Sequence, residues 1–520
     1  MRSVFVALCL VCLGCATAQP PPVSPTPARE SSEDQSFLGE PSADSKKAPK
    51  WSVPPAPAKC EPLASHGSRS NASCPAPEAA LSALDEALGQ ADTDERDARL
   101  AEIEDCDIGG KGLLVALRAD LGPTECADAI IGTRAEDTVA ALTTVTRDAL
   151  KGLSLAAKLS RLVREPPRAQ PPYTKERVRA FVSGTMAQWV TEQAQAIQAL
   201  ALEGSRLSSY GKGVVAIEAG LADMRFVEAF REVPLPQEYV DDAELTEAYY
   251  ASLDQALEPR KLRGRDAALV GLRALADLGT LRDPRVSRAR ELLSRLFNGR
   301  RIDALDGLLL PPLPAPDPKT THERLAARLP AFYSTIFLHG VDVKGPAMTL
   351  AFLQRGMPDW LRPPAGKSDL MPETAKWVAR GIFERGRTYW RAEDFRQAGA
   401  IADRVGGSED MKLLGALARA LEQGPQDAAA MMLRGPMPQG VGAVSELDAL
   451  ARGGGAAAGF AAYDAAFILE LVPPTERATE FFDDLALRYR RAAQMLSNPR
   501  HQTLARERAE AAEATAKAVP

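Results

Sequence analysis

The sequence predicts an all-α protein in which helix hairpins form an α-solenoid or tandem helical bundles after a disordered, Pro-rich tether. The composition favours helix, because the 520 residues include 89 Ala and 47 Arg but only 6% aromatic residues. Apolar residues recur at helical spacing along the chain, and no alternating pattern of useful length indicates a strand. A chain of this length exceeds one ordinary hydrophobic core, so several domains or one elongated array is expected.

The N-terminus has the features of an export signal. Arg2 precedes an apolar run, Val4–Leu13, of ten residues, and about 20 would be needed to span a bilayer. Gly14-Cys15 follows, and this resembles the lipobox of bacterial lipoproteins, although Cys12 replaces the usual Leu. The resemblance implies a signal peptide over 1–14 and lipidation, including palmitate, at Cys15. An ordinary signal peptide cleaved after Ala16-Thr17-Ala18 is the alternative.

The lipoprotein resemblance also implies a location. In that family Ala16, rather than Asp, after the lipidated Cys implies export to the outer membrane, most simply with the body facing the periplasm. Acyl chains would supply the anchor, since each buried methylene contributes about 0.8 kcal/mol. Residues 15–76 are rich in Pro, as in Gln19-Pro20-Pro21-Pro22, and we expect this segment to form a disordered tether without a packed core.

Four cysteines remain beyond the signal and Cys15, namely Cys60, Cys74, Cys106 and Cys126. In an oxidising periplasm they would form two disulfides, for which three connectivities exist. We favour the sequential pairing, Cys60 to Cys74 and Cys106 to Cys126, in which each loop closure contributes about 3 kcal/mol. The chain has no CxxC spacing and only one nearby His, so a zinc site is not expected here.

Pro-rich breaks divide the helical part into three predicted domains: an N-terminal cluster carrying the cysteines over 77–165, a helical domain over 173–310 and a repeat-like domain over 319–520. The helices are expected at 79–88, 94–104, 113–121, 123–131, 135–164, 174–207, 214–233, 237–257, 259–279, 283–298, 320–338, 345–355, 370–391, 394–405, 409–423, 426–433, 444–452, 456–471, 475–496 and 500–518.

Two stretches resemble helical repeat families. Leu414-Gly415 and Ala418, with Ala428 and Met432 beyond a Gly424-Pro425 turn, resemble a tetratricopeptide repeat, in which small residues stand where two helices cross closely. The second stretch resembles the helical linker blocks of large tetratricopeptide-type envelope proteins of predatory and gliding bacteria, and it carries Tyr210-Gly211-Lys212-Gly213, Ile217-Glu218-Ala219-Gly220, Pro234-Leu235-Pro236, Ala248-Tyr249-Tyr250 and Leu278-Gly279. These resemblances imply a protein-binding scaffold within a motility or secretion assembly.

Charge is polarised along the chain, although the net charge of −6 gives no reason to expect nucleic acid. Residues 218–257 hold ten Asp/Glu and two Arg, whereas 259–301 hold twelve Lys/Arg and four Asp/Glu. The two segments either pair with each other or leave a basic surface for an anionic lipid, an acidic glycan or an acidic protein face. The candidate residues of that surface are Arg285, Arg288, Arg290 and Arg295.

Catalytic and cofactor motifs are incomplete. His322-Glu323 begins like HExxH, but Ala326 stands where the second zinc ligand is needed, and Gly366-Lys367-Ser368 has Leu361 in place of the first Gly of a phosphate loop. We therefore expect no cofactor, no metal site and no catalytic residue. Trp377, Tyr389 and Trp390 fit either carbohydrate stacking or a buried helix face.

The sequence thus predicts a membrane-anchored lipoprotein of the cell envelope that acts as a non-catalytic scaffold for envelope proteins. An envelope enzyme acting on peptidoglycan or another polysaccharide is the alternative, and a deep groove with a desolvated carboxylate beside Trp360 or Trp377 would favour it.

Overall fold

Helices make up almost all the regular structure of the computed structural model, which describes residues 52–67, 74–135, 142–297, 299–339, 341, 345–358, 371–436, 441–471 and 478–519. The all-α class is confirmed. In these residues the extended pairing consists of one isolated bridge, between Thr280 and Gly356. The signal peptide, Cys15 and Trp360 lie outside the described residues.

The N-terminal cluster contains five short helices, α1 (Glu61–Gly67), α2 (Pro77–Leu88), α3 (Thr93–Ile103), α4 (Leu113–Leu121) and α5 (Ala127–Ile131). Four of them match expected elements, but α1 lies in the segment predicted to be an unpacked tether. Cys60 and Leu63 are buried there, and α1 packs against α3 and α5. The prediction that no core forms before residue 77 is therefore wrong for residues 58–67.

All four expected cysteines form disulfides, but the sequential connectivity is wrong. Cys60 pairs with Cys126 and Cys74 with Cys106, with Cα–Cα distances of 5.1 and 5.3 Å. The tertiary packing explains the difference: α1 lies against α5, which places Cys60 beside the residue that precedes α5. The bonds therefore fasten residues far apart in sequence.

A buried ion-pair network completes this cluster. The side chain of Arg118, on α4, is fully buried and donates from Nε to Asp97 and from Nη1 to Glu104, at 2.8 and 2.6 Å. Arg118 also donates to the carbonyl of Leu63 on α1, and His66 Nδ1 lies 2.8 Å from Asp97. The two carboxylates compensate a guanidinium that would otherwise be costly to bury.

The central part is a bundle around α9 (Ser209–Arg231), which packs against α6 (Thr144–Arg161), α8 (Ala187–Ser205), α11 (Ala243–Asp277) and α12 (Pro284–Leu296). A helix contacted on several sides must be apolar around most of its circumference, and α9 is buried along most of its length. The expected helix at 174–207 forms α7 (Lys175–Phe181), a π-helical turn at Val182–Met186 and α8.

Glycines allow α9 and α11 to approach closely. A Cβ added to Gly220 would lie 2.7 Å from the backbone N of Ala268, and one added to Gly271 would lie 2.7 Å from the carbonyl O of Gly213. Distances this short to backbone atoms leave no room for a side chain. The Gly-rich pattern of 211–220 therefore has a packing role in this helix pair.

The helix α11 continues through Pro259, where the sequence predicted a break between two helices. A short α10 (Gln237–Val240) precedes it. Proline removes one backbone donor from a helix, and this cost is lowest where the freed carbonyl can be hydrated. Pro259 lies on the exposed side of α11, which is consistent with its tolerance there.

The C-terminal part stacks consecutive helices. Pro330 divides the expected helix at 320–338 into two, and the elements are α13 (Thr321–Arg328), α14 (Ala331–Phe337), α15 (Pro346–Phe352), α16 (Pro372–Tyr389), α17 (Ala392–Val405), α18 (Glu409–Glu422), α19 (Ala428–Arg434), α20 (Ser445–Gly453), α21 (Ala458–Glu470), α22 (Thr479–Met495) and α23 (Pro499–Ala518). Most pack against their neighbours in sequence, as in α16 with α17 and α22 with α23.

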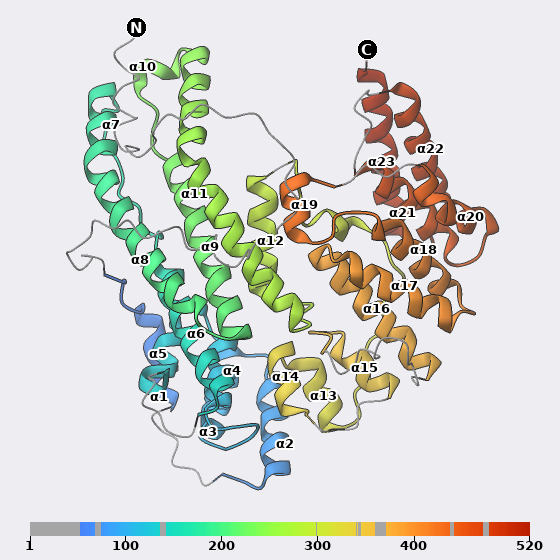
Figure 1. Cartoon of the computed structure of the whole chain (residues 1–520), viewed down its shortest axis with the longest axis horizontal. Helices are drawn as coiled ribbons and strands as arrows, with labels where there is room; N and C mark the ends of the chain where they lie inside the picture. Colours follow the sequence, from blue (N-terminus) through green and yellow to red (C-terminus); the bar gives the residue numbers. More distant parts are fainter. Residues whose placement is uncertain are drawn as a thin grey trace, which may run out of the picture.

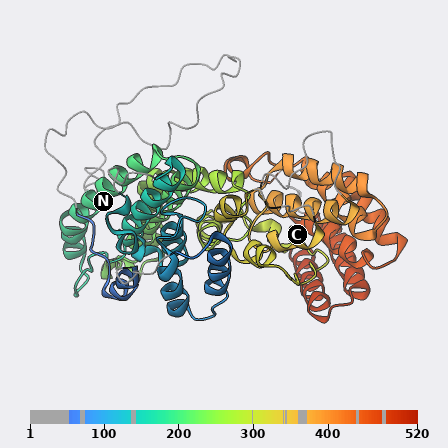
Figure 2. The ribbon, with the colours of Figure 1, turned by 90° about the horizontal axis from the view of Figure 1, so that it is seen from below.

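The N-terminal cluster, the central bundle and the C-terminal helices form one elongated molecule (Figure 2). A single cluster of buried apolar residues extends from Cys60 to Ala512, so it includes side chains from all three predicted helical domains. Two groups of helix ends project toward the top of the view in Figure 1. One consists of α7, α10 and the beginning of α11, and the other is the α22–α23 hairpin.

Candidate functional site

Arg285, the first candidate for a basic surface, is buried at the junction of several helices. Its Nη2 lies 2.6 Å from Asp120 Oδ1 on α4, and the hydroxyl of Tyr210 on α9 donates to Asp120 Oδ2 at 2.6 Å. The ring of Tyr210 stacks on Phe332 of α14, with centroids 4.1 Å apart. Burial raises the pKa of Asp120 above its ordinary value, although Arg285 opposes the shift. This cluster joins α4, α9, α12 and α14 inside the fold.

The other candidate arginines also form intramolecular ion pairs. Arg288 lies 2.9 Å from the buried carboxylate of Glu218. Arg290 is buried and lies 2.8 Å from Asp306, and Arg295 pairs with Glu228. Arg288 and Arg295 thus pair across the two oppositely charged segments, whereas Arg285 and Arg290 pair with Asp120 and Asp306, which lie outside 218–257.

Internal pairing accounts for only part of the acidic segment. Asp223 on α9 is buried and pairs with Arg260 and Arg263 at 2.9 and 2.6 Å, alongside the two glutamates described above. In contrast, Asp241, Glu244 and Glu247 have no ion-pair partner among the described residues. The negative charge that remains unpaired is therefore concentrated where α11 begins.

We call residues 238–258 the acidic tip. They contain seven Asp/Glu and no Lys or Arg. They form the end of α10 and the N-terminal half of α11, which project from the molecule beside α7 (Figure 1). Asp242 caps α11 by accepting a hydrogen bond from the backbone N–H of Leu245.

One face of the acidic tip carries a regular charged stripe. Glu244, Glu247, Asp254 and Glu258, with Ala251 between them, follow spacings of three and four residues, which places them on one side of an α-helix. Leu253 and Leu257, each one position before a carboxylate of the stripe, lie about a quarter of a turn around the helix from it and pack against Val227 of α9. The first four residues of the stripe are exposed and Glu258 is half-buried, so the stripe faces away from the bundle.

Exposed apolar side chains also occur on this projecting segment. Val240, Leu245 and Tyr250 are 60%, 44% and 37% exposed, and they account for three of the eight large apolar side chains that are exposed in the described part of the chain. Tyr250 stands three residues after Glu247 and four before Asp254, so it lies beside both carboxylates on the helix surface. The acidic tip therefore presents apolar and anionic groups together.

The acidic tip contacts a lysine of α7, besides Arg231, which pairs with Asp254, and Lys261, which pairs with Glu258. The ammonium of Lys175 lies 5.8 Å from the centroid of the Tyr239 ring, and the backbone N–H of Lys175 donates to Glu238 at 3.1 Å. Backbone N–H groups, its own and that of Lys175, lower the pKa of Glu238. The rings of Tyr239, Tyr249 and Tyr250 follow one another at 6.2 and 5.5 Å. Tyrosine faces attract cations, so the Tyr239 ring holds the ammonium of Lys175, while Glu238 holds the backbone N–H of the same residue.

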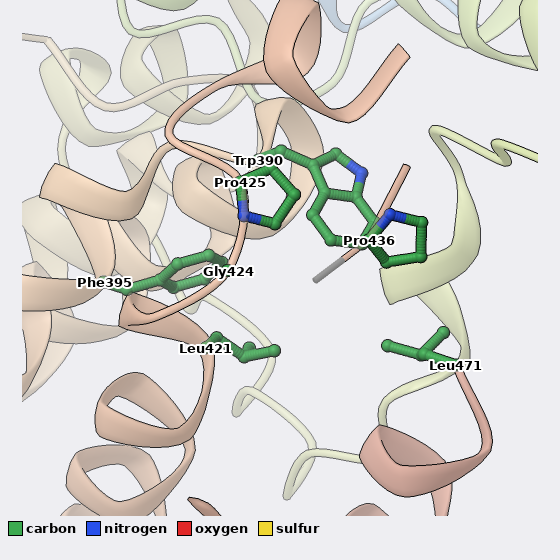
Figure 3. A pocket seen from close by; sticks show the side chains of 7 residues that line it. All are labelled: Trp390, Phe395, Leu421, Gly424, Pro425, Pro436 and Leu471. Carbon is green, nitrogen blue, oxygen red and sulfur yellow. The ribbon is translucent and has the colours of Figure 1, made fainter. Parts of the chain in front are cut away.

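Two pockets among the described residues are small. One of the two best-formed pockets has a volume of about 10 Å³, space for about one water molecule. It is lined by apolar groups, including Trp390, Phe395, Pro425 and Pro436 (Figure 3). Tyr389 and Trp390 are buried, and the indole N–H of Trp390 donates to the carbonyl of Ile302, so both belong to the core.

The second pocket, of about 30 Å³, lies beside Trp377 and includes Pro311 and Asp410. Asp410 is half-buried and lies 3.4 Å from Lys376, whose ammonium stands over the Trp377 ring. A carboxylate with an ion-pair partner and partial hydration lacks the desolvation that an acid catalyst in a deep groove would have.

Searches for relatives found no matching family model, no matching curated protein and no matching solved structure. Among the described residues, no group of three or more His, Cys, Asp or Glu is placed to hold a metal ion. None of the helices in the same residues combines the length and the apolarity that a membrane crossing requires.

The sequence indicated the acidic segment, but it did not indicate which of its carboxylates are paired and which are exposed. The ten acids of 218–257 form one run in the sequence, whereas the structure pairs those on α9 and leaves those at the start of α11 exposed. The sequence signal that could have shown this division was the absence of Lys and Arg from 238–258. Val240, Leu245 and Tyr250 were a second signal, because they do not follow the spacing of the buried Leu253 and Leu257.

Proposed function

We propose that this protein is a non-catalytic helical scaffold of the cell envelope, anchored to the outer membrane through Cys15, which binds other envelope proteins. The acidic tip is its main docking surface. The scaffold class is supported by an elongated array of helix hairpins whose best-formed pockets are too small for a substrate.

The observation that carries the proposal is the exposed face of α11 at the acidic tip. Exposed apolar groups that are rimmed by polar residues are typical of protein–protein interaction sites. Val240, Leu245 and Tyr250 supply the apolar groups, and Asp241, Glu244 and Glu247 supply the unpaired charges. An enzyme is less well supported, because the pocket at Trp377 is shallow and its carboxylate is ion-paired.

The anchor is tested separately from the scaffold. Cys15→Ala should move the protein from membrane fractions into soluble periplasm, because acylation of Cys15 supplies the attachment in this proposal. Cys12→Ala is the matched control, since it also removes a signal-region cysteine and should leave fractionation unchanged. Membrane association of Cys15→Ala equal to that of the unaltered chain would remove the anchor from the proposal.

The scaffold is tested by crosslinking in intact cells, followed by affinity purification and mass spectrometry. Recovery of a few envelope proteins in a fixed ratio to the tagged chain is the expected result. Purification of the chain with no crosslinked protein would contradict the scaffold, and hydrolysis of peptidoglycan by the purified chain would establish the enzyme instead.

A further inference from the structure

We propose that the acidic tip docks a basic helical segment of a partner protein, whose Lys or Arg side chains pair with the stripe on α11. This inference rests on the proposed scaffold function and adds the chemistry of the partner.

The charge of the surface selects the class of partner. With seven acids and no Lys or Arg, residues 238–258 repel nucleic acid and anionic lipid, and they attract a cationic protein segment. Lys175 of α7 contributes a positive charge next to the acidic tip. Its ammonium lies over the ring of Tyr239, which precedes Glu244 and Glu247 in the sequence. Within the stripe, Asp254 pairs with Arg231 and Glu258 with Lys261, so the negative charge left for a partner is that of Glu244 and Glu247.

The geometry of the stripe selects the shape of the partner. Carboxylates at 244, 247, 254 and 258 follow the alternating spacing by which two helices pack side by side. Ala251 lies in the middle of the stripe and is small enough to let a second helix approach. A partner helix with cations at matching spacings would place each of them near a carboxylate.

The contact made by Lys175 indicates how such a cation would be held. Within the fold, the ammonium of Lys175 lies over the face of Tyr239, while the backbone N–H of the same residue donates to Glu238. On the stripe, Tyr250 has Glu247 three residues before it and Asp254 four residues after it, and its side chain is 37% exposed. A partner Lys or Arg can therefore gain a ring contact and an ion pair together, which favours a cation over an apolar side chain at this position.

The proposal is tested by fluorescence anisotropy with the full chain carrying Cys15→Ala. The probe is a labelled helical peptide of Ala and Gln with Lys at positions i, i+3, i+7, i+10 and i+14. Glu244→Lys with Glu247→Lys should weaken its binding by about tenfold or more, and Tyr250→Ala by about two- to fivefold. The matched control is Glu507→Lys with Glu510→Lys on α23, an exposed pair at the same spacing without ion-pair partners.

The expected result is loss of binding in the tip variant, no change in the α23 control and weaker binding when the same five lysines are scrambled out of helical register. Equal losses in the tip and control variants would overturn the inference, because binding would then follow net charge alone. Equal binding of the ordered and scrambled peptides would overturn the helical partner.

The crosslinking experiment separates this inference from the scaffold proposal. If the unaltered chain and Glu244→Lys with Glu247→Lys capture the same envelope proteins in the same ratio, the scaffold stands and the docking site at the acidic tip is wrong. If neither captures a protein, the scaffold itself is contradicted. Circular dichroism and the melting temperature of the tip variant should match those of the unaltered chain, since Glu244 and Glu247 have no ion-pair partner among the described residues.

Discussion

The two halves of α11 differ in almost every physical respect although they belong to one continuous helix. Residues 260–277 lie against α9 with glycines at the contact, and Arg260 and Arg263 pair with the buried Asp223. Residues 243–258 are exposed on most sides and contact α9 mainly through Leu253 and Leu257. The comparison shows that one helix supplies both a structural core and an exposed surface, with Pro259 between them.

The largest effect is expected from Gly271→Leu in the inner half. A Cβ at this position would lie 2.7 Å from the carbonyl O of Gly213, so the two helices would have to move apart. We expect a loss of about 3 kcal/mol or more in the free energy of unfolding, measured by chemical denaturation. Gly299→Ala is the control, because no atom lies within 4 Å of its added Cβ. Equal stability of the two variants would contradict the close packing.

A somewhat smaller loss is expected from Asp223→Ala, which leaves two arginines without their shared carboxylate. Asp223 is 2% exposed, but Arg260 and Arg263 are partly hydrated, so we expect about 2 to 3 kcal/mol. Arg231→Ala removes an ion pair of the outer half, with Asp254, in which both side chains are about half exposed. That variant should lose less than about 1 kcal/mol. Similar losses in the two variants would break the contrast between the halves.

Pro259→Ala should stabilise the helix by about 1 to 2 kcal/mol, because alanine restores the backbone donor that proline lacks. Hydrogen exchange should become slower in residues 243–258, measured by mass spectrometry. Ala256→Gly is the comparison, since it also changes an exposed position of α11 but should speed exchange. A less stable Pro259→Ala would mean that the fold requires the local geometry that proline imposes.

The smallest effect concerns acid pH at the acidic tip. Because backbone N–H groups lower the pKa of Glu238, the stability it contributes is present above the ordinary Glu pKa and is lost as pH falls through the lower folded value. The melting temperature of Glu238→Gln should therefore differ from that of the unaltered chain above about pH 5 and converge with it in stronger acid. A constant difference at all pH values would contradict the charged hydrogen bonds with Lys175.

Much of the fold could be predicted from residue periodicity, and the errors have local causes. Most helices have strong apolar spacing, so their existence was evident. Pro259 suggested a break because proline usually ends a helix, yet its exposed position lets α11 continue. The Pro-rich surroundings of α1 hid a helix whose stability depends on Cys60, Leu63 and the rest of the cluster.

The surface was harder to predict than the core, because charge pairing depends on which helices meet. The sequence showed opposite charge on either side of residue 258 but could not show that Arg285 reaches Asp120 on α4. Nor could it show that Glu244 and Glu247 meet no cation in the part of the chain that the structure describes. The pairing of Cys60 with Cys126 has the same origin, since it depends on how α1 and α5 pack.

The Cys60–Cys126 bond has a mechanical consequence. A pulling force applied at the N-terminus would first load weak contacts such as the hydrogen bond from Arg161 to the carbonyl of Pro54. The force would then act on the covalent bond between Cys60 and Cys126, the residue that precedes α5. Tension would pass directly to the second side of the N-terminal cluster, and the chain between these two cysteines could not be drawn out as extended polypeptide while the bond is intact.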